Sequence, residues 1–374
     1  MIKIIADDKI PFLRGTLEPY ARIEFLPGKQ IDREAIMEAD ALLIRTRTRC
    51  TKELLTRTGV KFIGTATIGF DHIDTGFCNS QGIKWINAPG CNSSSVQQYI
   101  AAALLKLSHE FRLSLKDKIL GIIGAGNVGS KVEILAKALG MKVLLNDPPR
   151  ERREGSELFY DLDEVLRESD IVTLHVPLNI VGEDSTYHLI DEGTIKKMKK
   201  GVWLINTSRG EIAETSAFWK GLNSCRLEGA VIDVWENEPD IDRELMRTAF
   251  IATPHIAGYS ADGKANGTRM VVNALSDYFG LPLNNWYPEQ IPGPEDPVIM
   301  IDGKGKNDES VIGEAVTRTY NISEDDRKLR IWPADFEKQR GDYPLRREFS
   351  AYEAKLMNCS MSVKKTLAEI GFMI

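Results

Sequence analysis

Short runs of apolar residues alternate with longer amphipathic segments over roughly the first ninety residues of the chain. The apolar runs are bounded by polar turns, as buried strands of a parallel sheet are, and the segments between them have helical spacing. Strands are predicted at residues 2–6, 41–44, 61–64 and 84–87, and helices at residues 33–39 and 52–58. Strands separated by helices of this length predict βα units on a parallel sheet.

A long helix and a second alternating series follow a break at Pro89-Gly90. The helix is predicted over residues 93–111, and any serine of Ser93-Ser94-Ser95 could cap its start. Six further strands are predicted at residues 119–123, 142–146, 171–175, 202–206, 230–234 and 250–253. Six strands with helices between them are typical of a doubly wound, nucleotide-binding sheet, so the predicted fold class is α/β.

The chain changes in character from about residue 284, after a predicted helix at residues 267–279. Five prolines between residues 282 and 297 indicate a linker. The charged remainder carries predicted helices at residues 310–320 and 346–356 and is expected to form a small third domain.

Composition and charge argue against several classes of protein. Hydrophobic residues make up 43% and charged residues 27% of the 374 residues, the mix of an ordinary soluble protein of two or three domains. No apolar run is long enough to span a membrane, and a strand-like segment begins at Ile2, so a cleaved signal peptide is not expected. A net charge of −6 does not provide the basic footprint of a nucleic-acid-binding domain. The five cysteines are widely spaced and form no CxxC pair, which favours a reducing, cytoplasmic location and argues against structural zinc.

A glycine-rich loop opens the second series. Gly124, Gly126 and Gly129 form GxGxxG directly after a predicted strand and at the start of a helix. The first glycine allows the tight turn, the second lets the backbone approach a pyrophosphate, and the third allows close packing of helix and strand. The helix N-terminus, at Asn127 and Val128, is expected to offer unpaired N–H groups to the phosphates.

An acidic residue at the end of the next predicted strand indicates which cofactor binds. Asp147 lies 23 residues after Gly124, where a carboxylate can accept hydrogen bonds from the adenine ribose and would repel a 2′-phosphate. We therefore predict NAD rather than NADP. The alternatives are that Arg150, Arg152 and Arg153 hold a 2′-phosphate, or that the loop is only a glycine turn with a surface aspartate.

Three polar segments follow apolar strands further along the chain, at the sheet edge where this fold binds its ligand. Arg209 lies in the first segment, Glu238 in the second and His255 in the third. Taken singly, Arg209 is also explained as a surface pairing residue, Glu238 as a loop carboxylate and His255 as a turn histidine. Their occurrence in this order after GxGxxG favours a catalytic site.

These segments resemble the motifs of the D-isomer-specific 2-hydroxyacid dehydrogenases, and the resemblance covers residues 1 to about 284. The matching segments are GxGxxG with Asp147, Asn206-Thr207-Ser208-Arg209-Gly210, Asp233-Val234 with Glu238-Pro239, and Thr253-Pro254-His255-Ile256-Ala257-Gly258. The resemblance implies a Rossmann-type sheet inserted in a smaller flavodoxin-like α/β domain. Residues 1–92 and 256–284 would then bind substrate, residues 93–255 would bind NAD, and residues 285–374 would form a C-terminal α+β domain.

By the same resemblance, Arg209, Glu238 and His255 are the catalytic residues, and their chemistry fits this role. Oxidation of a secondary alcohol requires a base for the hydroxyl proton, and histidine ordinarily titrates near neutral pH. A carboxylate beside it stabilises the imidazolium and fixes its tautomer, which is the role of Glu238. Arg209 would hold the substrate carboxylate and stabilise charge on the reacting oxygen. Hydride chemistry belongs to the cofactor, so no metal is expected.

Further cofactor contacts are expected at Thr207, Ser208, Asp233 and Gly258, with Asp233 at the nicotinamide carboxamide as in the family. His175 ends another predicted strand and is expected to lie against the cofactor. A packing role is the alternative for His175.

The segment 66–74 matches the substrate loop of the family. Backbone N–H groups around Ile68 and Gly69 are expected to bind a carboxylate, because the glycine permits close approach. Thr67 is a candidate side-chain donor.

A row of arginines precedes this loop at the exit of the strand predicted at residues 41–44. Arg45 and Thr46 are candidate substrate-binding residues, and Arg45, Arg47 and Arg49 share one face if the chain stays extended. Three guanidinium groups would suit a phosphate. The alternative is a solvated strand exit.

The C-terminal segment resembles a domain found in one subfamily of these dehydrogenases. The matching parts are Asp335-Phe336-Glu337-Lys338, Tyr343-Pro344-Leu345-Arg346-Arg347-Glu348-Phe349-Ser350 and, more weakly, Leu367-Ala368-Glu369-Ile370-Gly371-Phe372. In that subfamily the domain forms a homodimer contact. The substrate there is 4-phospho-D-erythronate, oxidised at C2 to 2-oxo-3-hydroxy-4-phosphobutanoate in pyridoxal 5′-phosphate biosynthesis. Tyr259 also fits this subfamily and is a candidate substrate-binding residue.

Two other functions stay open at this point. One is another D-2-hydroxyacid dehydrogenase, such as a 3-phosphoglycerate dehydrogenase. The other is a non-catalytic, NAD-sensing binding protein on the same scaffold, because such proteins can keep the Arg-Glu-His set. The arginine row and the C-terminal segment favour oxidation of a small phosphorylated 2-hydroxy acid, without nucleic acid or membrane as partner.

Overall fold

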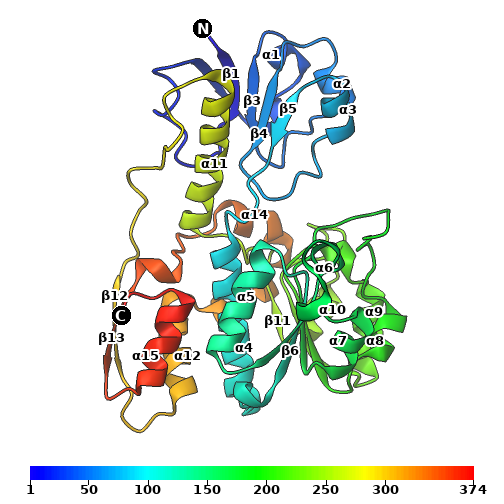
Figure 1. Ribbon diagram of the computed structural model, residues 1–374, viewed down its shortest axis with the longest axis vertical. Helices are drawn as coiled ribbons and strands as arrows, with labels where there is room; N and C mark the ends of the chain where they lie inside the picture. The colour runs from blue at the N-terminus through cyan, green and yellow to red at the C-terminus, as the bar shows by residue number, and fades with distance from the viewer. The chain divides into compact units, whose positions relative to one another are not determined.

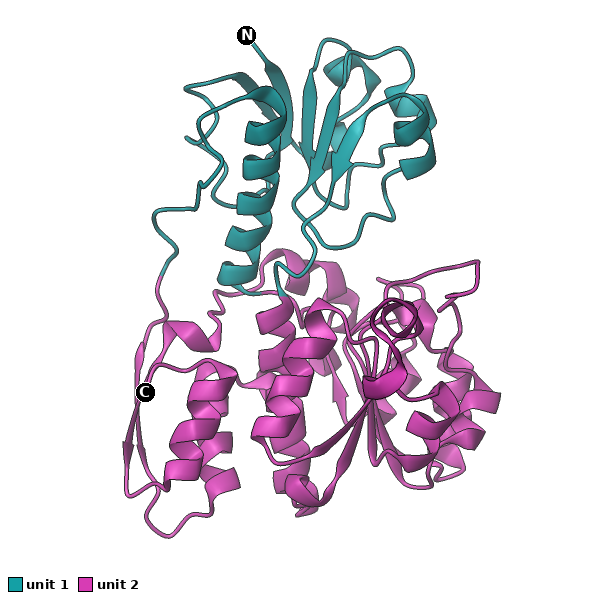
Figure 2. Cartoon of the chain, in the orientation of Figure 1, with its two compact units in different colours: residues 1–92, 260–292 teal, residues 93–259, 293–374 magenta.

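The computed structural model describes residues 1–374 and groups them into two units (Figure 2). Unit 1 contains residues 1–92 and 260–292, and unit 2 contains residues 93–259 and 293–374. The sequence predicted a return to the first domain at residue 256 and a separate domain from residue 285. The units instead change after residue 259, and the C-terminal segment 293–374, called the tail below, lies in unit 2. The division into three domains stays a prediction.

A five-stranded parallel sheet forms the centre of unit 1. Its strands are β1 (Lys3–Asp7), β2 (Arg22–Leu26), β3 (Ala41–Ile44), β4 (Phe62–Thr65) and β5 (Lys84–Ile86). They pair in the order β2-β1-β3-β4-β5, which is the flavodoxin-like order that the sequence predicted. Strand β2 was missed because it lies at the sheet edge and exposes Arg22 and Glu24, so it has no continuous apolar run.

Four helices surround this sheet: α1 (Arg33–Ile36), α2 (Lys52–Leu55), α3 (Thr75–Ser80) and α11 (Ala261–Phe279). The predicted helices at 33–39 and 52–58 end three residues earlier than expected. Helix α11 starts before the predicted residue 267, because the Ser260 side chain accepts the Gly263 N–H and caps the helix. Val271, Val272 and Leu275 of α11 belong to one buried cluster with apolar residues of the sheet. Figure 1 shows α11 alongside the strands of unit 1.

A six-stranded parallel sheet forms the centre of unit 2. Its strands are β6 (Ile119–Ile123), β7 (Lys142–Asn146), β8 (Ile171–Leu174), β9 (Val202–Asn206), β10 (Leu227–Ile232) and β11 (Ile251–Ala252). All six predicted strands are present, and three have the predicted bounds. The order β11-β10-β9-β8-β6-β7 places a switch point between β6 and β8, where a doubly wound sheet binds its ligand.

Helices cover both faces of this sheet, as doubly wound sheets require. One face carries α4 (Ser93–Phe111), with the predicted bounds, and α5 (Asn127–Ala138). The other carries α7 (Leu162–Glu168), α8 (Glu192–Lys197), α9 (Thr215–Asn223) and α10 (Arg243–Thr248), while α6 (Pro148–Glu154) follows β7. Six 3₁₀ turns complete the chain: Gly28–Gln30, Leu115–Asp117, Ser156–Leu158, Gly210–Ile212, Pro333–Asp335 and Phe349–Ala351. None of the helices combines the length and the apolar character needed to cross a membrane.

The tail forms a small α+β layer with a two-stranded parallel sheet. Its elements are β12 (Val298–Asp302), α12 (Asp308–Thr319), α13 (Ile322–Ile331), α14 (Phe336–Gly341), β13 (Glu353–Met357) and α15 (Met361–Ile370). Helix α12 lies where a helix was predicted at 310–320. The helix predicted at 346–356 is wrong, because Phe349 begins a 3₁₀ turn that ends at Ala351, and Ala354 is buried in a strand paired with β12.

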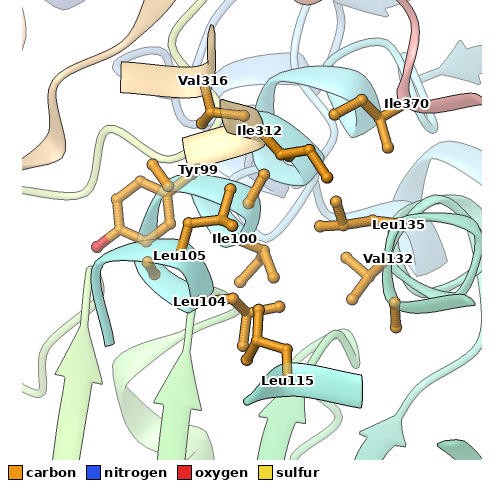
Figure 3. Packing of buried hydrophobic residues seen from close by; sticks show 14 of the residues in the cluster. Tyr99, Ile100, Leu104, Leu105, Leu115, Val132, Leu135, Ile312, Val316 and Ile370 are labelled. Atoms are coloured by element: carbon orange, nitrogen blue, oxygen red, sulfur yellow. The ribbon is translucent and has the colours of Figure 1, made fainter. Parts of the chain in front are cut away.

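The tail shares a hydrophobic core with the helices on one face of the unit 2 sheet (Figure 3). Ile312, Val316 and Ile370 of the tail belong to one buried cluster with Ile100 of α4 and Leu135 of α5. Two side-chain hydrogen bonds add to this contact. Gln98 Nε2 donates to Thr319 Oγ1 at 3.2 Å, and Thr366 Oγ1 donates to the Ala138 carbonyl at 2.9 Å. The tail is therefore packed as an extension of the doubly wound layer.

Candidate active site

The carboxyl ends of three neighbouring strands carry the predicted catalytic residues. Arg209 follows β9, Glu238 follows β10 and His255 follows β11, and these strands are adjacent in the order β11-β10-β9. Hydrogen bonds continue past the strand ends, from Asp233 N–H to the Asn206 carbonyl at 3.0 Å and from His255 N–H to the Asp233 carbonyl at 2.7 Å. The three polar segments therefore leave the sheet at the same edge.

A glycine allows the Arg209 segment to pack against the end of β10. A Cβ atom at Gly210 would lie 2.0 Å from the carbonyl carbon of Trp235, so no other residue fits there. The Arg209 guanidinium donates through Nη1 to the Ser208 carbonyl at 2.7 Å. The segment is thus held close to the strand that precedes Glu238.

The Glu238 carboxylate and the His255 imidazole form a hydrogen-bonded pair. His255 Nδ1 lies 2.8 Å from Glu238 Oε2, and the Trp235 N–H donates to Glu238 Oε1 at 3.0 Å. Burial would raise the pKa of Glu238, but His255, the Trp235 N–H and the charge of Arg340 together hold that pKa below its usual value. The ionised carboxylate fixes the proton on Nδ1, which leaves Nε2 as the nitrogen for proton exchange with a substrate.

Asp233 forms the turn in which His255 lies. Its carboxylate, almost fully buried, accepts hydrogen bonds from Thr253 Oγ1 at 2.6 Å and from the N–H groups of Ile256 and Ala257 at 2.8 and 2.9 Å. His255 itself has φ = +56°, a left-handed conformation that non-glycine residues adopt only when neighbouring contacts enforce it. The Asp233 side chain therefore has a structural role that sequence reasoning missed. Its expected contact with nicotinamide stays a prediction.

The glycine loop has the shape of a phosphate cradle. A Cβ at Gly124 would lie 2.6 Å from the His175 backbone, and one at Gly129 would lie 2.0 Å from the Gly124 carbonyl oxygen. Gly126 faces open space, so a phosphate can approach its backbone. Helix α5 begins directly after Gly126, which places its first N–H groups, including those of Asn127 and Val128, at this opening.

Asp147 and the nearby arginines have the arrangement expected for NAD. Asp147 lies directly after β7, and its carboxylate accepts the Ala125 N–H at 2.8 Å and the Arg150 N–H at 2.9 Å. The three arginines considered for a 2′-phosphate all pair with acidic side chains: Arg150 and Arg153 with Glu154, and Arg152 with Asp184. Each of the three guanidinium groups is thus held by an acidic side chain of the chain itself, which disfavours the NADP alternative.

His175 is positioned by two threonines at the ends of β8 and β9. Its Nε2 lies 3.0 Å from Thr173 Oγ1, and its Nδ1 lies 3.5 Å from Thr207 Oγ1. Burial lowers the pKa of His175 to about 3, so the ring is uncharged at neutral pH. Ser208 Oγ donates to the Leu174 carbonyl at 2.6 Å and joins the same two strands. The cofactor contacts of His175, Thr207, Ser208 and Gly258 stay predictions.

Tyr259, a predicted substrate residue, has neighbours from the tail. Its ring centroid lies 5.7 Å from that of Tyr343, and the Arg340 guanidinium carbon lies 5.8 Å from the Tyr259 ring. Arg340 also contributes to the low pKa of Glu238. No sequence pattern pointed to Arg340, because it lies 85 residues after His255 and its neighbours are apparent only in the fold.

The arginine row of unit 1 does not form as expected. The Thr48 N–H donates to the Arg45 carbonyl at 3.3 Å, so the chain turns after β3. The condition under which Arg45, Arg47 and Arg49 would share one face, an extended segment, is therefore not met, since alternation holds only in a strand. Arg45 donates through Nη1 to the Lys9 carbonyl at 3.2 Å, while Thr46 is exposed at the turn.

A chain of polar side chains holds the predicted substrate loop. Thr67 Oγ1 donates to the Gly69 carbonyl at 2.9 Å and lies 2.7 Å from Thr65 Oγ1, which in turn lies 3.1 Å from His72 Nε2. Asn87 Nδ2 donates to the Ile68 carbonyl at 2.7 Å. His72 and Asn87 received no role from the sequence, although His72 belongs to the loop motif itself.

Two family models match the chain. The model of the D-isomer specific 2-hydroxyacid dehydrogenase NAD-binding domain matches residues 94–257, which carry the glycine loop and His255. A model of a domain of unknown function matches residues 294–371, which form nearly the whole tail.

Curated proteins are similar to this chain over nearly its whole length. An erythronate-4-phosphate dehydrogenase of Bacteroides thetaiotaomicron is 50% identical over 94% of this chain and 98% of its own. One of Proteus mirabilis is 37% identical over 99% of both chains. At this coverage the similarity includes the tail.

Solved structures share the fold of about three quarters of the chain. A D-lactate dehydrogenase from Aquifex aeolicus, complexed with NAD and lactic acid, has a TM-score of 0.62 at 26% identity, and the match covers 74% of this chain and 95% of that one. A glyoxylate reductase from Paecilomyes thermophila has a TM-score of 0.63 at 25% identity, covering 74% and 94% of the two chains. The predicted α/β fold class is confirmed.

The low pKa of His175 makes stability depend on pH in a defined direction. Above about pH 6.5 the ring is neutral in both the folded and the unfolded chain, and its stabilising contribution is complete. Between about pH 6.5 and pH 3 the unfolded chain binds a proton that the folded chain does not. As the pH is lowered through this range, the contribution of His175 to the free energy of unfolding should therefore fall by about 1.4 kcal/mol per pH unit.

We expect the variant H175N to lose this part of the acid sensitivity. The measurement is urea unfolding of both proteins at about pH 7 and about pH 5. The difference in unfolding free energy between the two pH values should be smaller for the variant, and an equal difference would contradict an uncharged His175.

Proposed function

The chain belongs to the D-isomer specific 2-hydroxyacid dehydrogenase family, among the erythronate-4-phosphate dehydrogenases, and on this premise we propose that it oxidises 4-phospho-D-erythronate at C2. It is an NAD-dependent oxidoreductase. The proposed product is 2-oxo-3-hydroxy-4-phosphobutanoate, formed in pyridoxal 5′-phosphate biosynthesis. The observation that carries the proposal is the Glu238–His255 pair at the strand ends, in a chain whose tail is shared with relatives of that name. Five free cysteines support a cytoplasmic location, which we also propose.

The residues of unit 2 fit NAD. The open space at Gly126 and the N-terminus of α5 suit the pyrophosphate, and Asp147 lies where the ribose hydroxyls would bind. When bound, NAD supplies a hydride acceptor, which no side chain can provide.

His255 acts as the acid/base. Its Nε2 takes the proton of the C2 hydroxyl as the C2–H bond breaks, and the imidazolium that forms is stabilised by the carboxylate of Glu238 at 2.8 Å. In the reverse direction the same nitrogen returns the proton to the carbonyl oxygen. The carboxylate also keeps the ring in one orientation, so no rotation is needed between the two directions.

Arg209 binds the substrate carboxylate and stabilises negative charge on the C2 oxygen. We assign Thr67 and the backbone N–H groups of Ile68 and Gly69 to substrate binding as well, because Thr65 and Asn87 hold this loop in place. Arg45, Thr46 and Tyr259 complete the proposed substrate-binding residues.

The first test of this function is an assay of the purified protein with NAD and 4-phospho-D-erythronate. We expect turnover that is at least 10²-fold lower in H255A, since general base catalysis contributes about 10²–10⁴-fold. NAD binding, measured by quenching of tryptophan fluorescence, should persist in the variant. Preference for 3-phosphoglycerate in the same assay would favour the other dehydrogenase, and NAD binding without turnover of either acid would favour a sensor.

The variant E238Q tests the role assigned to the carboxylate. Glutamine keeps the shape of the side chain but removes the charge that stabilises a proton on His255. We expect kcat to fall about 10- to 1000-fold and the acid limb of the pH–rate profile to move to lower pH. An unchanged pH profile would show that Glu238 does not act through His255.

We propose that the chain forms a homodimer through its tail. The face of the β12–β13 sheet that points away from α12 and α15 exposes Val298, Met300 and Met357, which are 42%, 57% and 49% accessible. The same face carries Asp302, Glu353 and Lys355 as their cross-strand partners, so the interface proposed for it is of mixed polarity.

The variant M300E should dissociate this dimer, because association would remove the new carboxylate from water. Sedimentation velocity should give twice the mass of one chain for the unmodified protein and a single chain for the variant. I180E, which changes an exposed loop residue at 68% accessibility, should remain dimeric. A monomeric unmodified protein would contradict the proposal.

A further inference from the structure

Arg346 of the tail reaches the residues that directly follow His255. Its side chain is buried, and its Nη2 donates to the carbonyl oxygens of Ile256 at 3.2 Å and Ala257 at 2.6 Å. The same nitrogen donates to Ser95 Oγ, which itself donates to the Ala257 carbonyl at 3.0 Å. In the sequence, the segment that contains Arg346 only resembles the C-terminal domain of the subfamily. The proposed reaction gives Arg346 no role.

The turn after His255 is held from two directions. Asp233 accepts the N–H groups of Ile256 and Ala257, while Arg346 binds their carbonyl oxygens. Both polar groups of each residue are therefore engaged by buried charged side chains. Such bonds are stronger than neutral ones and leave the backbone little freedom to rotate. His255, at φ = +56°, is the residue that this arrangement restrains.

The tail also supplies the aromatic rings and the carboxylate that stabilise the buried guanidinium of Arg346. The Arg346 guanidinium carbon lies 4.5 Å from the Tyr320 ring and 5.8 Å from the Tyr343 ring, at distances where aromatic faces attract a cation. Both tyrosine hydroxyls donate to Asp325 Oδ2, at 3.0 and 2.7 Å, and the carboxylate balances the charge. Nε and Nη1 of Arg346 make no hydrogen bond, so the bonds of this side chain are concentrated on the turn and Ser95.

We propose that Arg346 is a positioning residue for His255, through which the tail supports catalysis in addition to packing. The proposal rests on the acid/base role proposed above for His255. Without Arg346, the two carbonyl groups lose their charged donor and keep neutral ones, the Tyr259 N–H on Ile256 at 2.9 Å and the Ser95 hydroxyl on Ala257 at 3.0 Å. The turn then gains freedom, and the imidazole no longer keeps its geometry toward Glu238. Arg346 does not touch the reacting atoms.

A second tail arginine provides a matched control. Arg330 of α13 donates to the carbonyl oxygens of Met246 and Ala249 at 2.6 and 2.7 Å, and it pairs with Asp326 at 2.8 Å. These carbonyls precede β11, whereas those bound by Arg346 follow it. Both arginines thus attach the tail to the same strand segment, but only Arg346 contacts the His255 turn.

The test compares R346M, R346K and R330M in the full-length protein at a temperature where all are folded by circular dichroism. For R346M we expect kcat with 4-phospho-D-erythronate to fall about 10- to 100-fold, the loss typical of a small misplacement of a catalytic group. KM for NAD should stay within about twofold, because the glycine loop is untouched. R346K, which keeps the charge and one donor direction, should recover part of the kcat. R330M should match the unmodified protein in kcat.

A second measurement does not depend on the substrate. Hydrogen exchange of a peptide covering residues 253–259 should be faster in R346M than in R330M, because the Ile256 and Ala257 N–H groups lose their fixed geometry. If the unmodified protein fails to oxidise 4-phospho-D-erythronate, the proposed function fails, and the exchange comparison still decides the role of Arg346. Equal kcat, or equal exchange, in R346M and R330M would overturn the proposal.

The variant S95A keeps the proposal testable if R346M does not fold. It removes the hydroxyl that bridges Arg346 and the Ala257 carbonyl without leaving a buried charge unpaired. A fall in kcat of about two- to fivefold, with unchanged KM for NAD, is expected for the loss of one such hydrogen bond. A kcat equal to that of the unmodified protein would count against the positioning role.

Discussion

The buried carboxylate of Asp233 fixes the geometry on which the active site depends. A carboxylate removed from water is stable only when its oxygens are bound, so the chain after β11 must wrap around it. Thr253, Ile256 and Ala257 provide the three donors, and His255 lies between them in a left-handed conformation. The direction from which the imidazole meets Glu238 follows from this turn. The contact between Glu238 and His255 is therefore a consequence of how one buried acid satisfies its hydrogen bonds.

The tail is connected to this turn because its hydrophobic core continues the core of the NAD-binding layer. Ile312, Val316 and Ile370 cover apolar side chains of α4 and α5 that would otherwise face water. Tyr99 of α4 links this core to the turn, since its hydroxyl lies 2.7 Å from Thr253 Oγ1. Packing in the tail and the position of the catalytic histidine are thus connected through a short series of direct contacts. The tail that marks the subfamily is also a support of the site.

The fold was predictable where each strand carries its own apolar run. Strands β6, β7 and β9 and helix α4 have the expected bounds, because strands buried on both faces are continuous in hydrophobicity and the helix has a serine-rich start. Prediction failed where a distant partner decides the structure. Strand β2 is a half-exposed edge, and β13 pairs with β12, about fifty residues earlier, so neither shows a local signal.

The sequence by itself determined the proposed chemistry: the glycine loop, the acid that follows the second strand of the NAD-binding sheet, and the ordered Arg209, Glu238 and His255. Each of these follows a strand within a few residues, and the parallel sheet brings such positions to one edge, so their order along the chain indicated a common site. The tertiary structure decided how the chemistry is held in place. It turned the chain after Arg45, assigned Asp233 to the catalytic turn and brought Arg346 to the carbonyls beside His255 from ninety residues away. Contacts of this kind depend on long-range packing, which no local pattern of residues records.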